Sequence, residues 1–200
     1  MTRPDPAQLL AAFRAASQHR SAPSSDFDLN LPVMLAPGRK LRPAGVLVAV
    51  QAKDMRLHLT KRSSRLKHHP GQIAFPGGKV DPDDANVTAA ALREAHEEIG
   101  LDPAQVEVLG TLSPHETVTG YLVTPVLGLV HGLFTPKPEA GEVEEAFTVP
   151  LEHVMRPANF RVESRLWRGA DRRYYAVPFG PYYIWGATAR ILRALADHAV

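Results

Sequence analysis

One segment of the sequence, Val87 to Ile99, has helical spacing and lies between regions with the pattern of β-strands. Gly100 follows it directly, and glycine readily adopts the left-handed conformation that ends a helix. Upstream, Met55, Leu57 and Leu59 alternate with polar residues, which is the period of a strand with one solvated face. A helix enclosed by strands points to an α+β fold or an α/β/α sandwich.

The remaining periodic segments extend this pattern along the chain. We expect helices at Pro6–Arg20 and Ile184–Ala196, and strands at Val46–Val50, Met55–Thr60, Ile73–Phe75, Val106–Leu112, Leu122–Leu133 and Ala146–Val149. A hairpin is expected between Phe160 and Val177, turning at Gly169-Ala170-Asp171. Strands with one central and one terminal helix predict a mixed sheet between helices.

The N-terminal 42 residues have a different character from the rest. Several of the 18 prolines fall between residues 23 and 43, so we expect an N-terminal helix followed by an extended lead-in over 1–42, and one domain over 43–200. Pro6 to Arg42 would serve either to cover the core or to form a homodimer.

Composition excludes several classes of function. With no cysteine, thiol nucleophiles and thiolate metal sites are excluded. The net charge of +2, with basic residues spread along the chain, argues against a nucleic-acid partner. The longest apolar runs are shorter than the roughly 18 residues needed to span a bilayer, and the N-terminus does not have the pattern of a secretory signal. We therefore expect a cytoplasmic protein without a membrane partner.

The helix from Val87 carries a crowded set of charges. Residues three and four apart are neighbours on a helix, so Glu94, Glu97 and Glu98 share one face and Arg93 reaches Glu97. A cation would neutralise their mutual repulsion, and hard oxygen ligands select Mg²⁺ or Mn²⁺. The alternative is a solvated helix face with an Arg-Glu ion pair.

Gly78 and the residues from Arg93 to Leu101 resemble the Nudix box, G-x5-E-x7-R-E-U-x-E-E-x-G-U, where U is a bulky aliphatic residue. The resemblance implies a Nudix-type α/β/α sandwich with a mixed sheet, in which Glu94 and Glu98 are the principal metal ligands. It makes Glu97 a further ligand or the base, and Arg93 an orienting residue. The sequence departs from the box at Asp84, which replaces Glu and lies eight residues before Arg93 instead of seven; its role stays open. Ala95 also replaces the bulky U.

Upstream, His58 to Gly78 is similar to the additional signature of the coenzyme A pyrophosphatase subfamily, L-L-T-x-R-S-x3-R-x3-G-x3-F-P-G-G. His58 and Lys67 stand where the pattern has Leu and Arg, and Lys keeps the charge but loses the bidentate geometry of Arg. Coenzyme A carries a diphosphate and a 3′-phosphate, so its site needs several cationic donors.

The residues of this loop are the candidate substrate-binding set. They are Lys61, Arg62, Ser63, Arg65, Lys67, Gly77 and Gly78. The alternative is a basic loop that is merely solvated.

An acidic stretch, residues 139–145, precedes the last expected sheet strand. In Nudix enzymes a glutamate from such a loop can join the metal site or act as base, which makes Glu142 and Glu145 candidates, and we assign Glu145 as the catalytic one. His115 is a second candidate base, although a lone loop histidine is more often structural.

Together these patterns predict hydrolysis, dependent on Mg²⁺ or Mn²⁺, of the diphosphate bond of coenzyme A or its derivatives. The products would be 3′,5′-ADP and 4′-phosphopantetheine or its acyl derivative. Two alternatives remain open: the same chemistry on ADP-ribose, NADH or a dinucleoside polyphosphate, or a Nudix-fold module that binds a ligand without turnover.

Overall fold

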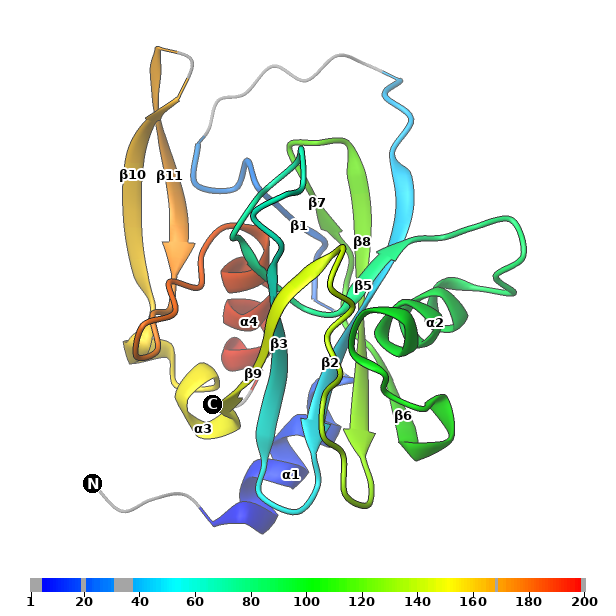
Figure 1. Ribbon diagram of the computed structural model, residues 1–200. Coiled ribbons are helices and arrows are strands. Elements are labelled where there is room, and N and C mark those ends of the chain that lie inside the picture. Colours follow the sequence, from blue (N-terminus) through cyan, green and yellow to red (C-terminus); the bar gives the residue numbers. More distant parts are fainter. Residues whose placement is uncertain (1–4, 19–20, 31–37, 168, 199–200) are drawn as a thin grey trace.

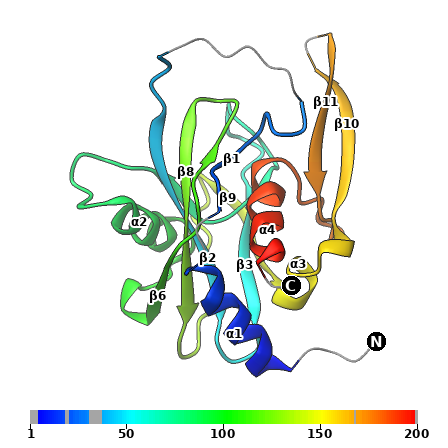
Figure 2. The same cartoon turned by 180° about the vertical axis from the view of Figure 1, so that it is seen from behind.

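A computed structural model describes residues 5–18, 21–30, 38–167 and 169–198 of the chain. A mixed β-sheet separates helix α2 (Val87–Ile99) on one face from α1 (Pro6–Ala16), α3 (Leu151–Val154) and α4 (Ala187–Asp197) on the other (Figures 1 and 2). The expected α+β class, in the form of an α/β/α sandwich, is confirmed.

The sheet contains nine strands within the described residues. They are β1 (Ser24–Ser25), β2 (Arg42–Gln51), β3 (Arg56–Arg62), β4 (Ile73–Ala74), β5 (Gly77–Lys79), β6 (Val106–Thr111), β7 (His115–Glu116), β8 (Tyr121–Val130) and β9 (Val143–Pro150). β2 and β8 pair in parallel over ten residues, and β1 pairs in parallel with β7. The other pairs are antiparallel, so the sheet is mixed as expected.

The period of two along the strands divides the core into two layers. Leu47 and Ala49 of β2 pack under α2, whereas Val48 and Val50 pack on the side of α1, α3 and α4. The N-terminal helix belongs to the second layer, because Phe13 is fully buried there. The apolar residues of the central strands are therefore buried on both faces, as in other sheets covered by helices on both sides.

Helix α2 has the bounds expected from the sequence. Asn86 caps its first turn by accepting hydrogen bonds from Thr88 N and Ala89 N, and Gly100 ends it with a positive φ of 71°. A Cβ at Gly45 of β2 would overlap the Val87 carbonyl, so this glycine permits the close approach of α2 to the sheet.

The sequence-based bounds differ from the structure mainly at element ends. α1 ends at Ala16 and is followed by a turn, with residues 19–20 of the expected helix outside the described ones, and α4 begins at Ala187 instead of Ile184. In the hairpin of β10 (Arg161–Trp167) and β11 (Ala170–Ala176), Ala170 already pairs with Trp167, so the turn is earlier than expected. The short strands β1, β5 and β7 were not expected, because two or three residues carry no detectable period. Part of the expected lead-in, residues 31–37, lies outside the described chain.

Candidate active site

Arg93 lies at the centre of a network of carboxylates on α2. Its Nε and Nη2 donate to the two oxygens of Asp84 at 3.0 and 2.9 Å, and its Nη1 donates to Glu97 at 3.0 Å and to Glu94 at 3.1 Å. Nη2 also reaches the Lys79 carbonyl at 3.3 Å. The hydrogen bonds to Asp84, together with the hydrogen bond to Glu94 and the negative charges of both residues, raise the pKa of Arg93 above its usual value. One guanidinium therefore fixes the positions of three acidic side chains.

Asp84, whose role the sequence left open, is the principal partner of Arg93. Asp84 closes a turn in which Asp84 N donates to the Asp81 carbonyl at 3.0 Å and Asp81 N donates to the Asp84 carboxylate at 2.8 Å. The hydrogen bond from Arg93 is the main reason that the pKa of Asp84 is lowered. Asp84 therefore contacts the Arg93 guanidinium, which in turn contacts the glutamates of α2.

Glu98 is the most buried carboxylate of the set, with 5% of its surface exposed. Its Oε2 accepts a hydrogen bond from Gly77 N at 3.2 Å. Burial, reinforced by repulsion from Glu94, raises the pKa of Glu98 to about 8, although Gly77 and the positive charge of Arg62 oppose this rise. A cation bound next to Glu98 would strongly stabilise its ionised form.

Glu94 lies next to Gly78, half-buried beside the sheet. Burial raises its pKa, and the Arg93 charge works in the opposite direction. A Cβ at Gly78 would overlap the Glu94 carboxylate, so the glycine leaves the space that this side chain occupies. Gly77 and Gly78, which were expected to contact the substrate, thus lie directly on the two carboxylates expected to bind the metal.

The chemistry of these donors fits a hard divalent cation. Glu94 and Glu98 offer oxygen atoms only, and they lie close enough for the charge of Glu94 to raise the pKa of Glu98. As they stand, no three His, Asp or Glu side chains of the described residues are gathered closely enough to hold a metal ion. Glu97, the third expected ligand, has a side chain that is 57% exposed and is held by Arg93.

The acidic loop after β8 lies against the C-terminal end of α2. Glu139 N donates to the Glu98 carbonyl at 2.9 Å, and the side chain of Glu139 accepts from Glu142 N at 2.9 Å. The charge of Glu142 contributes to the raised pKa of both Glu94 and Glu98. Glu142 is therefore the residue of this loop whose negative charge raises the pKa of the α2 carboxylates Glu94 and Glu98.

Glu145, the residue assigned above as catalytic, is placed on the other face of the sheet. It accepts a hydrogen bond from the Tyr182 hydroxyl, and Tyr182 stacks on Phe147, which belongs to the core layer of α4. Ala146, between them in sequence, packs with α2. Because alternate residues of β9 point to opposite faces, Glu145 points away from α2, and the structure does not bring it to the other candidate residues.

The basic residues at the end of β3 and in the loop between β3 and β4 lie in different environments. Lys61 pairs with Glu144 at 2.7 Å, and Ser63 is buried, with its N–H donating to the Glu142 carbonyl at 2.8 Å. Arg62 is half-buried and acts electrostatically on Glu98, whereas Arg65 and Lys67 are exposed. Of the expected cationic donors, Arg62 is thus the one whose positive charge lowers the pKa of Glu98.

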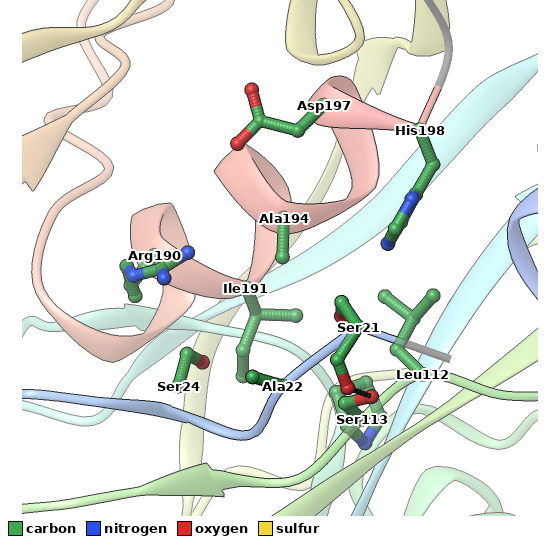
Figure 3. A pocket seen from close by; sticks show the side chains of 11 residues that line it. Ser21, Ala22, Ser24, Leu112, Ser113, Arg190, Ile191, Ala194, Asp197 and His198 are labelled. Carbon is green, nitrogen blue, oxygen red and sulfur yellow. Dashed lines mark hydrogen bonds between the residues drawn. The ribbon is translucent and has the colours of Figure 1, made fainter. Parts of the chain in front are cut away.

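Two other features lie away from α2. A cavity of about 100 Å³ between the lead-in and α4 is lined by residues such as Ser21, Ser24 and Arg190 (Figure 3) and has no lining residue in α2. His115, the second candidate base, is fully buried, with Nδ1 2.9 Å from Ser24 Oγ and Nε2 3.2 Å from Asp26. It joins β1 to β7 and does not reach the carboxylates of α2.

The chain is similar to known proteins in sequence and in structure. Residues 41–168 match the family model described as the NUDIX domain. The chain is 42% identical over 173 residues to the Uncharacterized Nudix hydrolase NudL of Enterobacter sp. (strain 638), and 40% identical to that of Citrobacter koseri; each alignment covers 86% of this chain and 90% of the relative. A MutT protein of Methanosarcina mazei Go1 superposes over 60% of this chain and 84% of its own, with 21% identity and a TM-score of 0.48. No helix of the described chain is long and apolar enough to cross a membrane.

Proposed function

The chain belongs to the Nudix hydrolase family and is a Nudix pyrophosphohydrolase, and from this premise we propose that it hydrolyses the diphosphate bond of coenzyme A or its derivatives. The products are 3′,5′-ADP and 4′-phosphopantetheine or its acyl form. The observation that carries the proposal is the half-buried Arg62, which acts on Glu98 from a loop with further basic residues. A diphosphate placed between this cation and the carboxylates would meet both a positive charge and the ligands for a metal.

The basic loop supports a substrate with more than one anionic group. Arg62 is the last residue of β3, and Arg65 and Lys67 are exposed in the loop that follows it. In our proposal Arg62 contacts the diphosphate, while Arg65 and Lys67 contact the separate 3′-phosphate, for which guanidinium and ammonium groups are suitable donors. Lys61 is partly neutralised by Glu144 and contributes less charge.

The proposed division of roles follows the contacts of α2. Glu94 and Glu98 would hold Mg²⁺ or Mn²⁺, which when bound supplies charge neutralisation and Lewis acidity at the diphosphate. Arg93, clamped by Asp84, keeps Glu94 and Glu97 in place. Glu97, exposed and at the outer side of the set, takes a proton from the attacking water.

The deciding experiment is incubation of the purified protein with coenzyme A and either Mg²⁺ or Mn²⁺, followed by chromatography for 3′,5′-ADP. Dephospho-coenzyme A serves as the matched substrate without the 3′-phosphate. We expect 3′,5′-ADP with coenzyme A and a lower kcat/KM with the dephospho form. Absence of product with both metals would rule out the coenzyme A assignment.

The alternatives are separated in the same assay. ADP-ribose, NADH and a dinucleoside polyphosphate test other diphosphates, because specificity is a ratio of kcat/KM values. An Arg65→Gln/Lys67→Gln variant should lower kcat/KM for coenzyme A and leave that for dephospho-coenzyme A nearly unchanged. Equal losses on both substrates would contradict the assignment of these residues to the 3′-phosphate.

A further inference from the structure

The hairpin of β10 and β11 forms a separate two-stranded sheet beside the main body, with β10 as the outermost strand in both views (Figures 1 and 2). Among the described strands β10 pairs with β11 alone. The edge of β11 that faces away from β10 is occupied at Arg173. The N–H of Arg173 donates to Asn30 Oδ1 at 2.7 Å, and its carbonyl accepts from Asn30 Nδ2 at 2.9 Å. The open edge of the hairpin is therefore β10.

The Asn30 contacts also fix which backbone groups of β10 face outward. Directly opposite residues of an antiparallel pair either exchange both hydrogen bonds or both point away from each other. Ser164 is opposite Arg173, and Arg173 directs its N–H and carbonyl to Asn30. Ser164 and, by the period of two, Val162 and Leu166 thus direct their N–H and carbonyl groups to the open edge.

The side chains on this edge are unusual for a strand in contact with water. Leu166 is 72% exposed and Val162 is 44% exposed, and both lie on the same face of β10. β10 contains no lysine or proline, the residues that commonly protect a free edge from pairing. Leaving such an edge unpaired exposes both apolar surface and backbone hydrogen-bonding groups.

The sequence of β10 is complementary to itself in one antiparallel register. If two copies meet about a two-fold axis at Ser164, Val162 faces Leu166 of the other copy and Glu163 faces its Arg165, and each pair occurs twice. Centring the axis on Glu163 or on Arg165 would instead place like charges opposite each other, which is unfavourable. The three outward-directed residues would then exchange hydrogen bonds across the axis.

We infer that β10 is the interface of a homodimer, in which two hairpins join edge to edge into a four-stranded antiparallel sheet. A second copy of this chain satisfies the open backbone groups, packs its Val162 beside Leu166 and pairs its Arg165 with Glu163. The contact is isologous, so it closes as a dimer and does not propagate. The inference is independent of the proposed substrate.

Ser164→Pro tests the interface without removing a hydrogen bond of the hairpin. Proline takes away the outward N–H and is tolerated at strand edges where the N–H faces solvent, and Ser164→Ala is the matched control that keeps it. By sedimentation velocity over a concentration series, the wild type and the Ala variant should reach twice the 21.9 kDa mass of the chain. The Pro variant should stay at 21.9 kDa with an unchanged circular dichroism spectrum.

A charge exchange tests the register. Glu163→Arg and Arg165→Glu each place like charges opposite each other and should each abolish the dimer, whereas the double variant restores opposite charges and should restore it. Within one copy Glu163 accepts from the Tyr183 hydroxyl and Arg165 lies over Trp185, and the double variant loses both contacts. Recovery of the dimer would therefore come from the pairing between copies. A wild type that stays monomeric, a dimer unchanged by Ser164→Pro, or a double variant that stays monomeric would overturn the inference.

Discussion

Asp84 binds the guanidinium of Arg93 through both of its carboxylate oxygens, at 3.0 and 2.9 Å. The same guanidinium holds Glu94 and Glu97 through its remaining nitrogen. Asp84 therefore acts on the carboxylates of α2 through Arg93. Two parallel bonds fix the plane of the guanidinium as well as its position.

Asp84→Asn should lower kcat by about 10- to 100-fold, the usual effect of removing a residue that orients a ligand. The amide has one acceptor oxygen where the carboxylate has two, so Arg93 loses one of its two hydrogen bonds to this residue. Glu94 and Glu97, which Arg93 holds, then become less well ordered. Steady-state kinetics with coenzyme A at saturating Mg²⁺ measures the effect. Asp83→Asn, an exposed neighbour with the same change of charge, is the control; equal losses in the two variants would contradict an orienting role for Asp84.

Glu98→Gln should reduce the rate by at least about 100-fold, because a buried carboxylate that binds the cation is replaced by a neutral amide. Without metal, Glu98 must take up a proton on folding at neutral pH because its pKa is raised to about 8, and glutamine need not, so the metal-free variant should be at least as stable as the wild type. Thermal unfolding with and without Mg²⁺ provides a second readout: the wild type should gain stability on adding the metal, and the variant should gain much less. A variant that retains the full metal-dependent rise would show that Glu98 is not a ligand.

The parts of the site that the sequence predicted are those set by local spacing. The bounds of α2 and the grouping of Arg93 with Glu97 follow from caps and from the helical period. The role of Asp84 was left open because its contact with Arg93 depends on the path of the non-helical residues between Asp84 and the start of α2, which carry no period in the sequence. On which face of the sheet Glu145 lies could not be predicted from the sequence, because it depends on β9, where the pairing with β3 shifts between Lys61 and Arg62. A shift of one residue exchanges the faces of a strand.

Glu142→Gln and Glu145→Gln should therefore have different effects. Removing the Glu142 charge, which acts on Glu94 and Glu98, should weaken the attraction for Mg²⁺ and raise the metal concentration needed for half-maximal rate by about 10-fold. Removing the Glu145 charge weakens the bond from Tyr182 and should cost about 1 kcal/mol of stability with little change in rate. Metal titrations and urea unfolding of both variants measure this, and a larger loss of rate in Glu145→Gln would restore Glu145 as a catalytic residue.

His58 makes the stability of the protein depend on pH. The leucine that the coenzyme A pyrophosphatase signature has at this position does not titrate and would not have this effect. The ring is 4% exposed, packs edge-on against Phe134 at 5.2 Å between centroids, and has no hydrogen-bond partner for either nitrogen among the described residues. Burial lowers the pKa of His58 from 6.5 to about 4. Between these values the unfolded chain binds the proton and the folded chain does not, so stability is complete above pH 6.5 and falls as the pH is lowered.

The loss should approach about 3 kcal/mol near pH 4, since each pKa unit corresponds to about 1.4 kcal/mol. His58→Leu should remove this component and, because no unpartnered nitrogen remains buried, raise stability at neutral pH as well. Urea unfolding of the wild type, His58→Leu and the exposed control His68→Leu at a series of pH values from 7 down to 4 isolates the effect of the buried ring. If His58→Leu loses as much stability as the wild type over this range, the pKa of His58 is not lowered on folding, and the folded protein must stabilise the charged ring as well as water does.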